Sequence, residues 1–172
     1  MLKNIKKILF ATDLSQECQD AYDTAVSLAM SCQASITLLH VIESPAESIE
    51  DQLRNLLGEE RYGKIMTEHE NSTRSILIGK RKESDIIQSA LFQFCEDRKD
   101  NYPGCYLQPD EIVIKHGDIA KEILSAAVER DVDLIILSAH KTILTGASSV
   151  SRIPKSILRL SKVPVLIVPP RG

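Results

Sequence analysis

Short apolar runs alternate along this chain with longer segments in which apolar residues recur every three or four positions. Five such runs lie at residues 6–12, 34–42, 111–115, 133–137 and 163–168. They lack the polar alternation of a half-exposed strand, and this predicts strands that are buried on both faces, as in a parallel sheet. The pattern therefore predicts a five-stranded parallel sheet in an α/β fold.

The segments between these runs have the period of amphipathic helices. We expect helices at residues 15–31, 119–130 and 151–161. Ser15 is a candidate N-cap for the first, because a serine hydroxyl can accept a hydrogen bond from a free amide of the first turn. Pro154 is compatible with the first turn of the last, where backbone N–H groups have no partner inside the helix.

The middle of the chain, residues 45–109, departs from this alternation. It is charged and helix-prone, and it predicts two helices near residues 47–70 and 84–99, with a break around Gly79, followed by a loop at 101–109 that contains two prolines and a glycine. We expect this segment to be a helical insertion between the second and third strands of a single domain covering residues 1–172.

Right-handed crossovers between parallel strands place helices on both faces, which gives a doubly wound sheet. Ligands of such sheets bind at the carboxyl ends of the strands, near the point where the strand order reverses. This predicts one crevice bordered by Asp13, Val41 and the 138–152 loop. Pro164 indicates an edge position for the last strand, because proline cannot donate to a central ladder. The same edge could pair with a second copy of the chain.

Composition narrows the choice of partners. The 172 residues carry a net charge of −3, 43% are hydrophobic and 26% are charged, with lysines and arginines scattered along the chain. No nucleic-acid or anionic-membrane partner is therefore expected. No apolar run reaches membrane-spanning length and the start is too polar for a signal peptide, so we expect a cytoplasmic protein. The four cysteines match no redox or zinc motif and are expected to be free thiols.

Several short motifs, in their order and spacing, carry a family resemblance. They are ILFATDLS before an alanine-rich helix, ITLLHV, HGDIAKEIL, DLIILSAH and VPVLIV, and they cover roughly residues 5–44 and 110–169. Together they resemble the universal stress protein family. The resemblance implies an adenine nucleotide alpha hydrolase-like fold with strand order 3-2-1-4-5, usually as a homodimer. It also implies that some members bind ATP through a glycine pattern: Gly, two residues, Gly, nine residues, then Gly with Ser or Thr.

That glycine pattern falls on Ser138, Lys141, Ser151 and Arg152, so its spacing is kept and all three glycines are replaced. A backbone that curls around phosphates needs positive φ angles and close approach without a Cβ atom. We therefore expect the replacements to crowd a phosphate cradle. Lys141 and Arg152 could still bind a small anion near a helix amino terminus, although a solvated loop with ordinary basic residues is the simpler interpretation.

Two other family positions are retained. Asp13 matches the aspartate that the family uses beside the base and ribose, and Val41 matches a backbone position near the adenine. Each also has a structural interpretation, because Asp13 could cap the following helix and Val41 could belong to the core.

Catalysis has weak support in the sequence. A Ser138–His140 pair lacks an orienting carboxylate and the sharp turn of a nucleophile elbow, and the histidines and carboxylates show no metal-ligand spacing. Two functions stay open. One is a non-enzymatic stress-response regulator that dimerises through residues 163–168, without conventional ATP binding. The other is an ATP- or AMP-binding protein with a divergent phosphate loop and at most slow ATPase activity.

Overall fold

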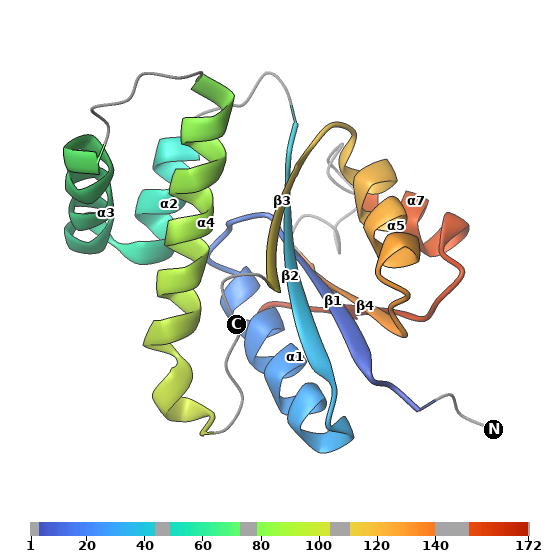
Figure 1. Ribbon diagram of the computed structural model, residues 1–172. Helices are drawn as coiled ribbons and strands as arrows, with labels where there is room; N and C mark the ends of the chain where they lie inside the picture. Colours follow the sequence, from blue (N-terminus) through green and yellow to red (C-terminus); the bar gives the residue numbers. More distant parts are fainter. Residues whose placement is uncertain (1–3, 44–48, 73–78, 104–110, 140–151, 172) are drawn as a thin grey trace.

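The computed structural model describes residues 4–43, 49–72, 79–103, 111–139 and 152–171, and it contains one parallel sheet (Figure 1). The strands are β1 (Lys7–Thr12), β2 (Ser35–Ile42), β3 (Ile112–His116), β4 (Leu134–Ser138) and β5 (Val165–Val168). Their order in the sheet is β3-β2-β1-β4-β5 and every neighbouring pair is parallel. The predicted fold class and the edge position of β5 are confirmed.

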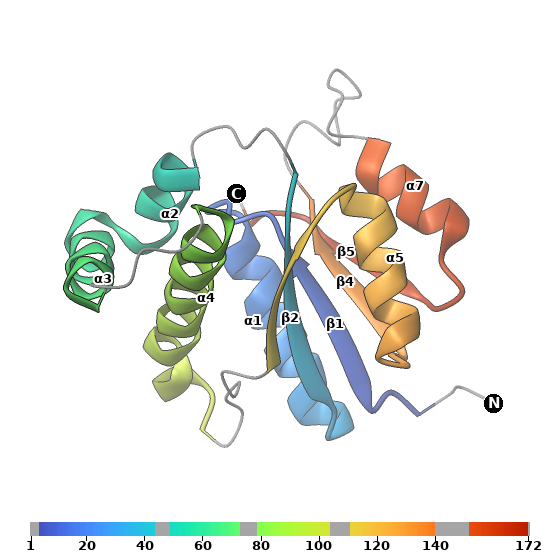
Figure 2. The same cartoon turned by 45° about the horizontal axis from the view of Figure 1, so that its top comes forward.

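Helices cover both faces of this sheet (Figures 1 and 2). The helices are α1 (Cys18–Cys32), α2 (Ile49–Leu57), α3 (Glu59–Ser72), α4 (Gly79–Asp97), the 3-10 turn η1 (Lys99–Asn101), α5 (Ile119–Glu129) and α7 (Arg152–Leu160). In the figures α1 and α4 lie on one face, α2 and α3 lie outside α4, and α5 and α7 lie on the other face. None of the described helices is long and apolar enough to cross a bilayer.

Alternate residues of each strand supply two separate cores, because successive side chains of a strand point to opposite faces. Phe10 and Leu38 pack with residues of α1, α2 and α4, whereas Leu9 and Leu39 pack with residues of α5 and α7. All four of these side chains are fully buried. This double burial explains why the strands appear in the sequence as continuous apolar runs.

The helical insertion differs from its prediction at two helix boundaries. The segment predicted as one helix at residues 47–70 is two helices, α2 and α3, separated by Gly58. Gly58 has a φ of +82°, and its N–H donates to the Arg54 carbonyl at 2.8 Å. A left-handed residue at this position ends α2, and glycine adopts that conformation without a Cβ penalty. The sequence also predicts a break around Gly79, but Gly79 is the first residue of α4, and residues 73–78 before it lie outside the described ones.

The insertion is clamped to α1 at the far end of α4. Arg98 donates from Nε to Asp23 Oδ1 and from Nη2 to Asp23 Oδ2, both at 2.9 Å. Its guanidinium also lies 5.3 Å from the centre of the Phe94 ring. Both partners of the ion pair are largely covered, with side chains 22% exposed. A bidentate ion pair of this kind fixes the orientation of the end of α4 relative to α1 as well as their separation.

Candidate functional site

The carboxyl ends of β1, β2 and β4 form one edge of the sheet, because the three strands are parallel neighbours. Thr12 pairs with His40 in β2, and Ala11 pairs with Leu137 in β4. Asp13 follows directly after β1, Val41 is the penultimate residue of β2, and Ser138 is the last residue of β4. The fold therefore brings three of the predicted site residues to the same edge.

A tight turn joins β1 to α1 at this edge. Asp13 Oδ1 accepts a hydrogen bond from the Ser15 N–H at 2.9 Å, and Thr12 Oγ1 accepts one from the Leu14 N–H at 3.1 Å. Leu14 is fully buried and has a φ of +62°, which is unusual for a residue with a branched side chain. Side-chain hydrogen bonds and burial together hold this strained backbone in place.

Ser15 does not cap α1, so that prediction is wrong. The helix begins three residues later at Cys18, and its N-cap position is Glu17, which makes no side-chain capping bond. The Ser15 carbonyl instead accepts from the Cys18 N–H at 3.2 Å. The turn needs the extra residues because Asp13 and Thr12 have already used their side chains to bend it. Among the described residues the buried Ser15 hydroxyl has no hydrogen-bond partner.

His40 lies near the end of β2, and its side chain contacts the neighbouring strand β1. Its Nδ1 is 2.9 Å from the Thr12 carbonyl oxygen. A carbonyl can only accept, so this contact requires the proton on Nδ1 and leaves Nε2 as the acceptor. Burial lowers the pKa of His40 from its ordinary value of 6.5, with the side chain 6% exposed, and favours the neutral ring.

The remaining predicted site residues have different environments. Val41 is 7% exposed and its side chain belongs to the core under α5 and α7, so only its backbone can face the crevice. Ser138 is 9% exposed, and the next residue donates its N–H to the Val168 carbonyl at 2.8 Å. Arg152 is the first residue of α7 and is exposed. Lys141 and Ser151 lie outside the described residues, as does His140.

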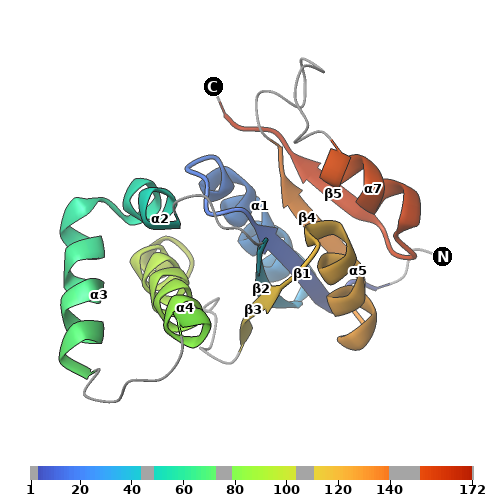
Figure 3. The same ribbon diagram turned by 90° about the horizontal axis from the view of Figure 1, so that it is seen from above.

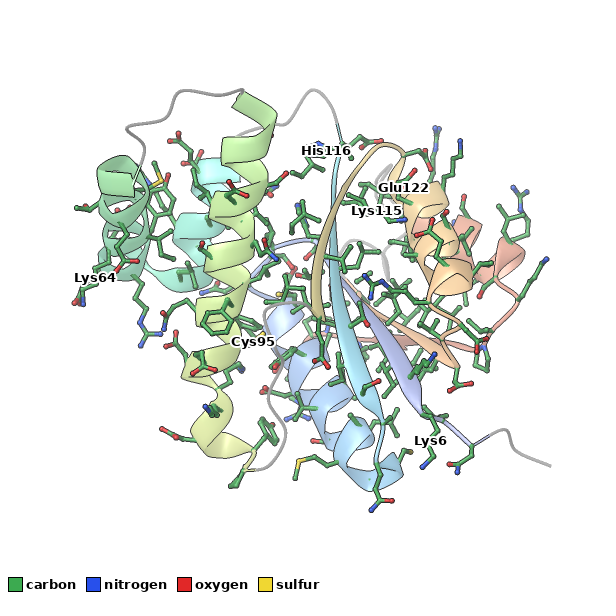
Figure 4. All side chains as sticks on the ribbon, viewed as in Figure 1. Lys6, Lys64, Cys95, Lys115, His116 and Glu122 are labelled. Atoms are coloured by element: carbon green, nitrogen blue, oxygen red, sulfur yellow. The ribbon has the colours of Figure 1, made fainter. Side chains whose placement is uncertain are left out.

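Sequence reasoning missed one contact at the same edge. His116 at the end of β3 is exposed, and its Nε2 lies 3.0 Å from the Ser84 hydroxyl of α4. The preceding residue, Lys115, points to the opposite face and pairs with Glu122 and Glu129 at 3.7 and 2.8 Å (Figure 4). The alternation of side chains along a strand could have predicted that Lys115 and His116 point to opposite faces. The His116–Ser84 contact places α4 of the insertion beside the carboxyl edge of the sheet.

Nucleophiles and metal ligands are scarce in this region. Burial raises the pKa of the thiols of Cys18 and Cys95 to about 12, so both stay protonated at neutral pH. The described residues contain no group of three or more histidines, cysteines or carboxylates able to hold a metal ion.

Comparison with known proteins gives a consistent match. The sequence model described as "Universal stress protein family" matches residues 4–169. A curated protein, universal stress protein MJ0577 of Methanocaldococcus jannaschii, is 26% identical over 168 residues, which cover 95% of this chain and 94% of that protein.

Solved structures show the same fold. The structure of hypothetical protein MJ0577 has a TM-score of 0.62 and 22% identity, and the match covers 99% of each chain. UspA from Lactobacillus plantarum has a TM-score of 0.61 and 19% identity, over 96% of this chain and 99% of that one. A universal stress protein in complex with cAMP has a TM-score of 0.58 and 16% identity, over 98% and 100%.

Proposed function

Because the chain belongs to the universal stress protein family, we propose that it is a non-catalytic regulatory protein of the stress response that does not bind ATP in the conventional manner of the family. The edge formed by the carboxyl ends of β1, β2 and β4 is where ligands of doubly wound sheets bind, so this edge is the position of a nucleotide site in the proposal. Its phosphate side is altered at the positions where the ATP-binding pattern has glycines.

Ser138 is the observation that carries this proposal. It ends β4, next to β5, and its side chain is buried at 9% exposure. In the family pattern this position is the first glycine, where a phosphate-binding backbone approaches its ligand without a Cβ atom. A buried serine side chain here occupies space that the pattern leaves empty, and the adjacent backbone N–H is already bonded to Val168. Both features work against a phosphate at this point.

The polar groups on the nucleoside side support a binding role more than a catalytic one. Asp13 Oδ1 is used to hold the β1–α1 turn, and His40 is neutral, buried and bonded to the Thr12 carbonyl. A general base must reach the proton that it removes, and a nucleophile needs such a base beside it. Neither residue has that geometry in this turn.

A second function, nucleotide binding through a divergent loop, is favoured by one observation. By the family resemblance, Asp13 and Val41 match positions that nucleotide-binding members use near the base and ribose, and a universal stress protein of similar fold has been solved in complex with cAMP. Cyclic AMP carries a single phosphate, so it makes a smaller demand on a phosphate cradle than ATP does. Under this alternative the protein binds AMP or cAMP, with at most slow ATPase activity.

Thermal shift assays with ATP, ADP, AMP and cAMP separate the two functions. Under the proposal ATP leaves the melting temperature unchanged, because a ligand raises it only by binding the folded state. Under the alternative a nucleotide raises it, and Asp13→Ala removes the effect. Micromolar binding of ATP would overturn the proposal. Nucleotide binding that survives Asp13→Ala would show that the nucleoside side is assigned to the wrong residue.

A further inference from the structure

Charge is distributed unevenly along this chain. Residues 134–172 contain no aspartate or glutamate, and they contain six cations, Lys141, Arg152, Lys155, Arg159, Lys162 and Arg171. Since the whole chain has a net charge of −3, residues 1–133 carry −9. In a protein that is otherwise acidic, a basic segment of this length attracts negatively charged partners that the rest of the surface repels.

Three of these cations share one face of α7. Arg152, Lys155 and Arg159 are spaced by three and four residues, so at about 100° per residue they lie within about 60° of one another around the helix. All three are exposed, and Lys162 is exposed just beyond the helix end. The opposite face holds Ile157, which is fully buried against the sheet. The cations therefore form a single outward row.

These four cations have no acidic partner in the part of the chain that the structure describes, whereas several basic residues of other elements have one. Arg98 pairs with Asp23 and Lys115 pairs with Glu122 and Glu129. Unpaired cations in a row repel one another, which costs stability unless a complementary surface is present.

Exposed leucines flank the row. Leu158 and Leu160 are 53% and 56% exposed, and the helical angle places one on each side of the cations. Both are among the few large apolar side chains in the described structure that are more than one third exposed. Seen from above, α7 lies beside β5 on the side of the sheet away from α2 and α3 (Figure 3). This surface therefore combines a row of positive charges with an exposed apolar side chain on each side of it.

We propose that this face of α7, defined by Arg152, Lys155, Arg159, Lys162, Leu158 and Leu160, binds an acidic amphipathic segment of another protein. Carboxylates at helical spacing match the row of cations, and apolar residues beside them cover the leucines. Charge complementarity of this kind steers association and sets the register of the complex. Arginine is also among the residues that contribute most to protein interfaces.

Other occupants fit this surface less well. Two copies meeting through the same face would oppose like charges across the two-fold axis. Nucleic-acid phosphates would pair with the cations and leave the leucines exposed. A membrane would gain only two leucines, because the main apolar face of α7 is already packed on the sheet.

Fluorescence anisotropy with a labelled synthetic peptide tests the proposal. The peptide is a helical 18-mer with glutamates at positions i, i+3 and i+7 and leucines beside them. We expect wild-type protein to bind it, with affinity falling as salt rises from about 50 to 300 mM because the charges are screened. Lys155→Glu/Arg159→Glu should weaken binding at least tenfold. The matched control, Lys64→Glu/Lys99→Glu, makes the same change in net charge at two exposed lysines of the insertion, on the other face of the sheet from α7 (Figure 1), and should weaken it less than twofold.

Further measurements separate the proposal from its alternatives. Leu158→Ser/Leu160→Ser should weaken binding and leave the salt dependence unchanged, and equal losses from both charge-reversal variants would show a non-specific charge effect. Tighter binding to vesicles of phosphatidylserine and phosphatidylcholine, or to a DNA duplex, than to the peptide would assign the surface to a membrane or to nucleic acid. Absence of peptide binding at low salt would also contradict it.

Discussion

At the scale of single residues, the polar side chains at the carboxyl edge of β1 and β2 already hold hydrogen bonds within the fold. Thr12 and Asp13 bend the β1–α1 turn with their side chains, and Leu14 adopts a φ of +62° to let the chain leave the strand. His40 donates to the Thr12 carbonyl from β2. The edge of the sheet is thus shaped by side-chain hydrogen bonds, and the strain at Leu14 is held by burial.

His40 predicts an acid sensitivity of the fold. Burial lowers the pKa of His40, so the unfolded chain takes up a proton at a higher pH than the folded protein does. The contribution of neutral His40 to the stability of the fold is therefore complete above the unfolded pKa of about 6.5. It is lost as the pH falls below that value, through the folded-state pKa. Urea denaturation of wild type and His40→Asn should give a stability difference that is constant between pH 7 and 8 and shrinks towards pH 5. A difference that grows at low pH would contradict this account.

Residue-level features were also the hardest to predict. Asp13, Val41 and Ser138 could be placed at one edge from the order of strands alone, because topology determines where strands end. The turn after β1 could not be predicted in the same way. Ser15 has the sequence signature of an N-cap, but the side chains of Thr12 and Asp13 bond the backbone before it, and the helix begins only at Cys18. The start of the helix is decided by which neighbouring side chain bonds the free backbone amides first, and the helix propensity of a single residue does not include that competition.

At the scale of elements, the insertion depends on one glycine that the periodic pattern hides. Residues 47–70 are helix-prone throughout, and Gly58 interrupts them only because its left-handed conformation ends α2. Gly63 lies within α3 and causes no interruption. The same residue type therefore has opposite meanings five positions apart, according to whether the backbone φ is positive.

Alanine substitutions at these two glycines should have opposite effects. Neither would meet another atom within 4 Å, so only backbone conformation matters. Gly58→Ala should lower the free energy of unfolding by about 1 kcal/mol, because alanine must adopt a positive φ. Gly63→Ala should raise it by about 0.5 to 1 kcal/mol, because alanine favours the helix. Denaturant titration measures both, and a shift of the same sign for the two variants would show that the α2–α3 boundary is misplaced.

The α7 row shows how a sequence signal can be overlooked at this scale. Counted over the whole chain, the cations look scattered and argue against any anionic partner. Placed on a helix, Arg152, Lys155 and Arg159 form one exposed face. The absence of acidic residues after Asp133 is visible in the sequence, and it gains meaning only when the helix shows which cations lie together.

At the scale of the whole molecule, β5 is an edge strand, and within the described residues it pairs with β4 on one side only. It is the last strand of the sheet, and its four residues are only partly buried. We propose that this edge, residues 163–168, joins two copies into a homodimer, since an unpaired apolar edge is a template for pairing.

A charge in β5 should therefore separate the copies. Val165→Glu or Ile167→Glu should give a folded monomer by sedimentation velocity and circular dichroism, because a carboxylate opposes burial in the interface. Val128→Glu is the control, since Val128 is 69% exposed on α5, and it should leave the mass unchanged. A wild-type monomer, or a dimer that survives both β5 variants, would place the interface elsewhere or remove it.

The central claim is that the fold of the family is kept while its ATP chemistry is not. Isothermal titration calorimetry with ATP tests it most directly, using wild type and the triple variant Ser138→Gly/Lys141→Gly/Ser151→Gly. The account predicts no measurable heat of binding for wild type and a gain of binding when the glycines are restored. Micromolar binding of ATP by the wild-type protein would contradict it.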